Sequence, residues 1–147
     1  MERPKVNYVA LLVVALIQFM FGAVWYSPML FANKWMQLTG ITMEMASAAS
    51  PWKSYGLTFV AYIVLSWVLL HALYYAKARS LGEGAMVGFM NWLGFVATVM
   101  GITNRFALQP WMLWAINGGY QLVNFVLGGL ILTLWHRKIW DSEASKS

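Results

Sequence analysis

Residues 112–135 read MLWAINGGYQLVNFVLGGLILTLW, a run of 24 residues without a charged side chain. A helix needs roughly 20 such residues to cross the ~30 Å hydrocarbon core of a bilayer. The run does not alternate between polar and apolar residues as the strands of a membrane barrel do, so a helix is expected. Asn117, Gln121 and Asn124 follow at i, i+4 and i+7 and share one face of that helix. The stretch therefore predicts a membrane-spanning helix with one polar face.

Three further runs lack Asp, Glu, Lys and Arg: residues 6–26, 57–75 and 84–102. Of the 147 residues, 61% are hydrophobic and only 10% are charged, whereas a soluble domain carries about 25% charged residues. The connections at 76–83 and 103–111 are short, which makes consecutive helices antiparallel neighbours. We predict an all-α polytopic membrane protein, a single domain over residues 1–147 with four transmembrane helices in an antiparallel bundle.

The first connection, residues 27–56, is longer and contains helix signals of its own. Ser27 is a suitable N-cap, Pro28 suits the first helical position, and Gly40 supplies a stop. Apolar side chains repeat at helical spacing between them: Phe31, Trp35 and Leu38. We expect a short helix that lies in the membrane interface, then one or two turns over residues 42–49 before Pro51 breaks the chain.

The Lys and Arg residues outside the runs set the expected orientation. Seven fall on the side that holds both termini: Arg3, Lys5, Lys77, Arg79, Arg137, Lys138 and Lys146. Three fall on the other side: Lys34, Lys53 and Arg105. The side richer in Lys and Arg is normally cytoplasmic, so both termini are expected inside and residues 27–56 outside. The net charge of +5 follows no basic stripe, so no nucleic-acid partner is expected.

One segment resembles the opening signature of a known bacterial family, the domain-of-unknown-function family 1761. It runs Gly22-Ala-Val-Trp25-Tyr26-Ser27-Pro28 and continues to Phe31 and Trp35-Met36. Three later segments are also similar: Leu81-Gly-Glu83-Gly84-Ala-Met-Val-Gly88, Trp92-Leu-Gly94-Phe95 and Asn117-Gly-Gly-Tyr120. The resemblance covers nearly the whole chain. It implies a four-helix protein of the bacterial inner membrane and carries over no activity and no catalytic or binding residue.

Because the spans lack charges, their amides and hydroxyls are the candidate ligand-binding groups. They are Gln18, Ser66, Asn91, Asn117, Gln121 and Asn124. Polar groups in hydrocarbon need partners, so their helix faces are expected to point inward together. Four of them lie within about two residues of a span's centre, roughly 3 Å of helix rise, and are expected to meet at the midplane: Gln18, Ser66, Asn91 and Asn124. Two interpretations stay open, a polar pocket or pore lining and hydrogen bonds that join the helices.

Small residues in the spans predict close helix contacts. Gly84 and Gly88 form a pair with the spacing of small-residue helix interfaces, and Gly128 continues the polar face of the last run. Such contacts serve either within the bundle or between protomers. We expect a homo-oligomer in the lipid bilayer.

The sequence argues against catalysis. It has no Cys, which excludes thiol catalysis and thiolate metal sites. Its carboxylates are dispersed, with Glu44 and Glu83 expected on opposite sides of the membrane. We therefore expect no enzyme, no metal and no cofactor. A haem held between His71 and His136 is conceivable, but histidines at the ends of helices are the simpler interpretation.

Two functions remain open. One is a transporter or channel that passes an uncharged or amphipathic small molecule through the midplane cluster, with Trp67, Trp92 and Tyr120 nearby to receive it. The spans contain no carboxylate, which disfavours proton-coupled export of cations. The other is a structural or accessory protein that packs with a partner complex or with lipid. The two differ in whether the polar faces close on one another or leave a cavity.

Overall fold

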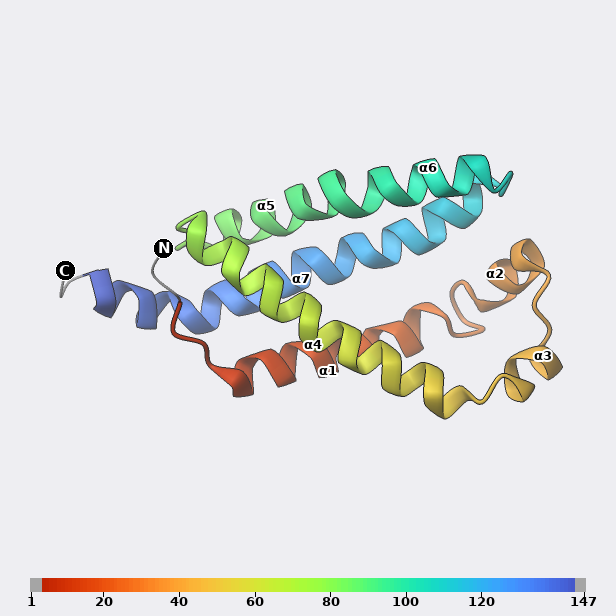
Figure 1. The fold of residues 1–147 in the computed structure, drawn as a ribbon, viewed down its shortest axis with the longest axis horizontal. Coiled ribbons are helices and arrows are strands. Elements are labelled where there is room, and N and C mark those ends of the chain that lie inside the picture. Colours follow the sequence, from red (N-terminus) through yellow and green to blue (C-terminus); the bar gives the residue numbers. More distant parts are fainter. Residues whose placement is uncertain (1–3, 145–147) are drawn as a thin grey trace.

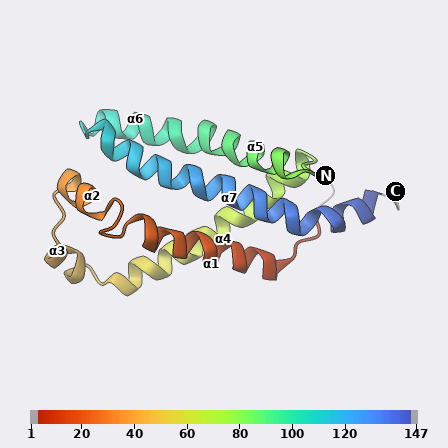
Figure 2. The same cartoon turned by 180° about the vertical axis from the view of Figure 1, so that it is seen from behind.

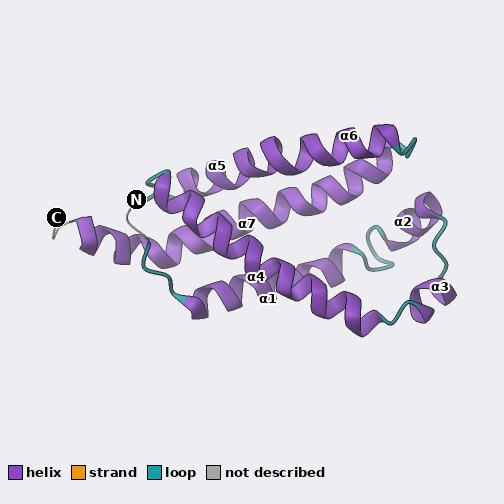
Figure 3. Cartoon of the chain, in the orientation of Figure 1, coloured by secondary structure: helices purple, strands orange, loops and turns teal. Residues whose placement is uncertain are grey.

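The computed structural model describes residues 4–144, with side chains up to Trp140. Arg3 and Lys146, which enter the count for orientation, and the chain ends Met1 and Ser147 lie outside the described residues. Within the described part, every regular element is a helix (Figure 3). Four helical stretches are long and apolar enough to cross a membrane: Tyr8–Trp25, Pro51–Tyr75, Leu81–Phe106 and Trp111–Trp140. The prediction of an all-α protein with four membrane spans is confirmed.

The elements follow one another in a simple order. The first span is α1 (Tyr8–Trp25), followed by the short helices α2 (Ala32–Thr39) and α3 (Met43–Ala48) and by the second span, α4 (Pro51–Tyr75). The third span comprises α5 (Leu81–Asn91), the π-helical segment η1 (Trp92–Ala97) and α6 (Thr98–Phe106). The last helix, α7 (Trp111–Ala144), is the fourth span and extends nine residues past the predicted end at position 135.

The first connection forms helices, but the boundaries differ from those predicted. The first short helix starts at Ala32 instead of Pro28, because residues 27–31 form a turn in which the Ser27 carbonyl accepts from the Leu30 and Ala32 N–H groups. Gly40 ends this helix with φ +72°, in the left-handed region that favours glycine. Pro51 does not break the chain: it opens α4, where the missing N–H leaves no helical hydrogen bond unmade.

The other three spans pack against α7 unequally. The chain reverses between consecutive long helices, and the start of α1 and the end of α7 lie at the same end of the molecule (Figure 1). The third span runs along α7 over most of its length, whereas α4 crosses α1 obliquely, as the view from behind also shows (Figure 2). Both α1 and α4 also contact α7 directly. The last helix therefore joins the crossed pair on one side to the third span on the other.

The π-helical segment interrupts the third span near its middle. A π-turn shifts the backbone hydrogen bonds by one residue and so leaves carbonyls that need other donors. The Trp114 indole N–H donates to the Ala97 carbonyl at 3.1 Å, and the Thr98 hydroxyl donates to the Gly94 carbonyl at 2.6 Å. In return, the Trp92 indole N–H donates to the Gly118 carbonyl at 2.9 Å. These indole bonds lock the third span to α7 at two levels.

Candidate functional site

Three of the predicted polar residues meet where α1, α4 and α7 come together. Gln18, Ser66 and Asn124 each have 0% of their surface exposed. The Gln18 amide nitrogen donates to the Asn124 backbone carbonyl at 3.0 Å, and the Ser66 hydroxyl donates to the Gln18 amide oxygen at 3.1 Å. One glutamine side chain thus bonds both neighbouring helices with its two polar atoms.

Two tyrosines complete this arrangement. The Asn124 amide nitrogen donates to the Tyr62 hydroxyl at 3.3 Å, and Tyr62 donates to the Tyr120 hydroxyl at 2.5 Å. Tyr120 in turn donates to the Gln18 backbone carbonyl at 3.4 Å, which returns the chain of bonds to α1. We call these five residues the three-helix network: Gln18, Tyr62, Ser66, Tyr120 and Asn124. Neither tyrosine is among the candidate residues predicted from the sequence, although Tyr62 shares a helix face with Ser66, four residues on.

Two other candidate residues, Asn91 and Asn117, make their hydrogen bonds outside this network. The Asn91 amide donates to the Val87 carbonyl of its own helix at 2.9 Å, so the expectation that it joins the midplane cluster is wrong. An amide that reaches back one turn meets its need for a partner without facing another helix. Asn117 lies near the start of α7 and accepts from the Tyr26 hydroxyl at 2.8 Å. There it helps to fix the end of α1, together with the Trp25 indole, which donates to the Ile116 carbonyl at 3.1 Å.

The aromatic residues expected to receive a solute do not face a common space. Trp92 is buried and holds α7, Tyr120 belongs to the three-helix network, and Trp67 is 46% exposed beside His71. Their contacts are therefore separate, and of the three only Tyr120 bonds to the network.

The predicted glycines make close contacts within this chain. A β-carbon at Gly88 would overlap the Phe125 carbonyl, and one at Gly84 would lie 2.6 Å from the Gly129 carbonyl oxygen. A β-carbon at Gly128 would lie 2.9 Å from the Gln18 amide nitrogen, so this glycine makes room for the network. Of the two alternatives, contact within the bundle accounts for all three. The glycines thus give no support to an oligomer.

Gln121 lies at the edge of the network, where its side chain interacts with Tyr62, but its amide oxygen is not bonded. Its amide oxygen is buried, and no described residue donates a hydrogen bond to it; the same holds for the Asn124 amide oxygen. Gln121 and Tyr62 contribute to a cleft of about 330 Å³ between α7 and the first half of α4. The other lining residues come from α4: Leu57, Thr58, Ala61 and Leu65. We call this hollow the α4–α7 cleft.

Comparison with known proteins gives one match. A family model described as "Protein of unknown function (DUF1761)" matches residues 9–133. The chain belongs to this family. No curated protein and no solved structure matches it. The resemblance stated from the sequence is confirmed, and the DUF1761 description assigns no activity to the geometry above.

One of the two histidines of this DUF1761 protein, His136, has a hydrogen-bond partner at each ring nitrogen. His136 is fully buried; its Nε2 accepts from the Asn7 backbone N–H at 3.1 Å, and its Nδ1 lies 3.0 Å from the Leu132 carbonyl. These bonds define a neutral ring with the proton on Nδ1, since a carbonyl only accepts. With both nitrogens engaged, none is left to bind iron. The prediction that His136 lies at the end of its helix is also wrong, because α7 continues to Ala144.

Proposed function

We propose that this membrane protein is a non-catalytic binding protein for a small, uncharged molecule that enters the α4–α7 cleft from the lipid phase. The cleft lies along the first half of α4, where Leu57, Thr58 and Ala61 are exposed at the surface of a membrane span. Its lining contains no charged side chain. An ion would lose its hydration there without compensation, so a neutral ligand fits best.

This proposal rests on one observation: the buried amide oxygen of Gln121 has no hydrogen-bond donor among the described residues. A buried acceptor without a partner costs about 1–3 kcal/mol, and the described part of the chain supplies no donor for it. A ligand with one N–H or O–H group beside an apolar body would offset that cost. The aliphatic residues of the cleft, Leu57, Ala61 and Leu65, would pack against the apolar body.

The three-helix network limits the transport hypothesis. Its residues are buried and bonded to one another, so a molecule that passed between α1, α4 and α7 would have to break these bonds. The proposed ligand position lies beside the network. A transporter or channel for a neutral solute would accordingly move the solute along the side of α4. If it worked as a homo-oligomer, the contact between protomers would involve a surface other than the three glycines, which are already used within the chain.

A structural role is the second candidate, and the network itself favours it. Gln18, Ser66 and Asn124 join three spans without leaving the amide of Gln18 unpaired. Such bonds contribute about 0.6 kcal/mol each on average, which is typical of groups that hold membrane helices together. Under this alternative the cleft contains only lipid.

A pair of probes separates the two candidates. Fluoroindole carries one N–H donor on an apolar ring, and its N-methyl derivative lacks only that donor. Fluorine NMR on the full chain in lipid nanodiscs, with empty nanodiscs subtracted, gives the affinity for each. We expect Gln121→Leu to weaken fluoroindole binding about fivefold, the loss of roughly one hydrogen bond, and to leave the N-methyl derivative unaffected. Equal binding of both probes to the parent and the variant would favour the structural role.

A further inference from the structure

A second hollow lies at the far end of the third span, beside residues that the proposed function does not use. It is a shallow groove of about 490 Å³ between α6 and the start of α7. Ala97 at the end of η1 and Gly101 and Ile102 of α6 line it on one side, and Trp114 lines it on the side of α7. Arg105 lies one turn beyond Gly101, close to the end of α6 at Phe106. The groove is thus apolar along the helix and carries a single positive charge at its outer end.

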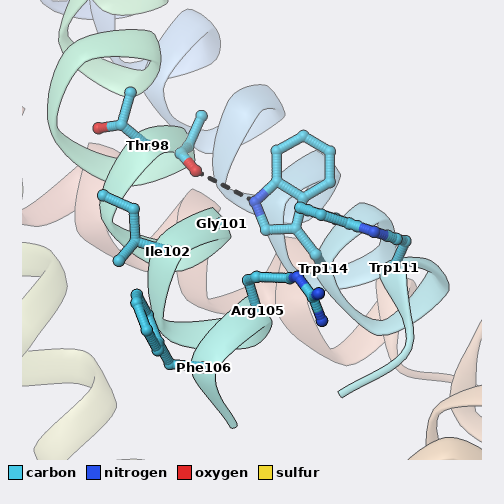
Figure 4. Close-up of a pocket in the computed structure, with 8 residues that line it drawn as sticks. Thr98, Gly101, Ile102, Arg105, Phe106, Trp111 and Trp114 are labelled. Carbon is cyan, nitrogen blue, oxygen red and sulfur yellow. Dashed lines mark hydrogen bonds between the residues drawn. The ribbon is translucent and has the colours of Figure 1, made fainter. Parts of the chain in front are cut away.

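The wall of the groove is held in place by the backbone. The Trp114 indole N–H donates to the Ala97 carbonyl at 3.1 Å, which fixes the ring beside Gly101 (Figure 4). A β-carbon on Gly101 would lie 3.4 Å from the Trp114 indole nitrogen, so this glycine lets the ring lie close to α6. The turn below is also fixed, because the Asn104 amide donates to the Gln109 carbonyl at 3.0 Å. The backbone that carries Arg105 is therefore held in place beside the groove.

The Arg105 guanidinium has no acceptor among the described residues. Its side chain is exposed and extends from α6 toward Trp111, whose ring is 59% exposed (Figure 4). Within residues 4–140 its guanidinium makes no salt bridge and donates no hydrogen bond, while its backbone carbonyl accepts from the Leu108 N–H. A membrane span that ends at Phe106 places this cation at headgroup level, with the apolar groove in the hydrocarbon.

We propose that the groove binds one anionic phospholipid from the bilayer, with the phosphate at Arg105 and an acyl chain along Ile102 and Trp114. The charge, the apolar lining and their order along the membrane normal match the order of groups in such a lipid. A guanidinium binds phosphate oxygens with two parallel N–H donors, which favours this headgroup over a neutral one. The groove and the α4–α7 cleft share no lining residue, so the two proposals stand independently.

The alternative is that Arg105 only stabilises the C-terminal end of α6, where a positive charge is favourable. Native mass spectrometry of the full chain, released from nanodiscs with equal parts of phosphatidylglycerol and phosphatidylcholine, distinguishes these roles. The variants are Arg105→Gln, which removes the charge, and Ile102→Trp, which fills the groove. Lys53→Gln is the matched control, since Lys53 is exposed near the start of α4, at the same end of the molecule.

We expect the parent to retain one phosphatidylglycerol in preference to phosphatidylcholine. Arg105→Gln should lower that occupancy about tenfold, the loss of roughly one hydrogen bond to a charged group. Ile102→Trp should lower retention of both lipids, and Lys53→Gln should match the parent. Equal retention by Arg105→Gln, an equal loss in Lys53→Gln, or displacement of the lipid by glycerol phosphate without acyl chains would overturn the proposal.

Discussion

At the scale of single residues, the amides of the spans show that depth in the membrane does not determine a role. Asn91 and Asn124 both lie near the middle of an apolar run, yet one bonds its own helix and the other bonds Tyr62 across the α4–α7 contact. Spacing along the sequence identified both as polar groups in need of a partner. It could not decide between a partner one turn back and a partner on another helix, because both satisfy the amide equally.

This difference predicts unequal costs for the same substitution. Asn124→Leu removes the donor to Tyr62 in a fully buried place, so we expect a loss of about 1–3 kcal/mol of stability. Asn91→Leu removes only a bond within its own helix, and we expect a much smaller loss. Melting temperatures of both variants in the same detergent measure this. Equal losses for the two would show that the three-helix network does not hold the spans together.

At the scale of elements, hydropathy and length predicted the four spans and the end of the second at Tyr75, while the start of the second, the extent of the third and the end of the fourth escaped prediction. Pro51 was expected to break the chain and instead begins α4, because proline is unfavourable inside a helix and acceptable in its first turn. The π-helical segment has no signal in composition either. It depends on donors that come from elsewhere, such as the Trp114 indole seventeen residues beyond Ala97.

The contact between α5 and α7 predicts how a glycine substitution acts. Gly88→Leu would drive a side chain into the Phe125 carbonyl, so we expect the third span to separate from α7 and the protein to melt at a clearly lower temperature. Gly82→Leu is the matched control, since Gly82 lies on the same helix with no atom within 4 Å of an added β-carbon. If both variants melt alike, the close approach of these helices contributes nothing to stability.

At the scale of the whole molecule, the position of the chain ends bears on orientation. The start of α1 and the end of α7 lie at one end of the molecule (Figure 1), as the even number of spans requires. From the excess of Lys and Arg on that side, seven against three, we predict that both termini are cytoplasmic. Reporter fusions at each terminus in a bacterial host test this. Activity of a periplasmic reporter at the C-terminus would reverse the orientation.

The sequence could predict the membrane fold and part of the candidate site. Gln18, Ser66 and Asn124 were recognisable as polar residues on inward faces, because apolar surroundings make such residues conspicuous. The α4–α7 cleft could not be predicted, since it depends on the oblique crossing of α4, which hydropathy does not encode. The distinct place of Gln121 at its edge, with an oxygen left unbonded, follows from that crossing.

Two roles are divided between neighbouring residues: the three-helix network holds the spans together, and Gln121 binds a ligand. The most direct measurement takes the melting temperature and the fluoroindole affinity of Gln121→Leu on one purified sample. We predict an affinity about fivefold weaker and a melting temperature close to the parent's, because the substitution removes a buried oxygen that has no partner and, of the network, touches only the contact with Tyr62. A lower melting temperature with unchanged affinity would contradict the claim and place Gln121 among the residues that hold the helices together.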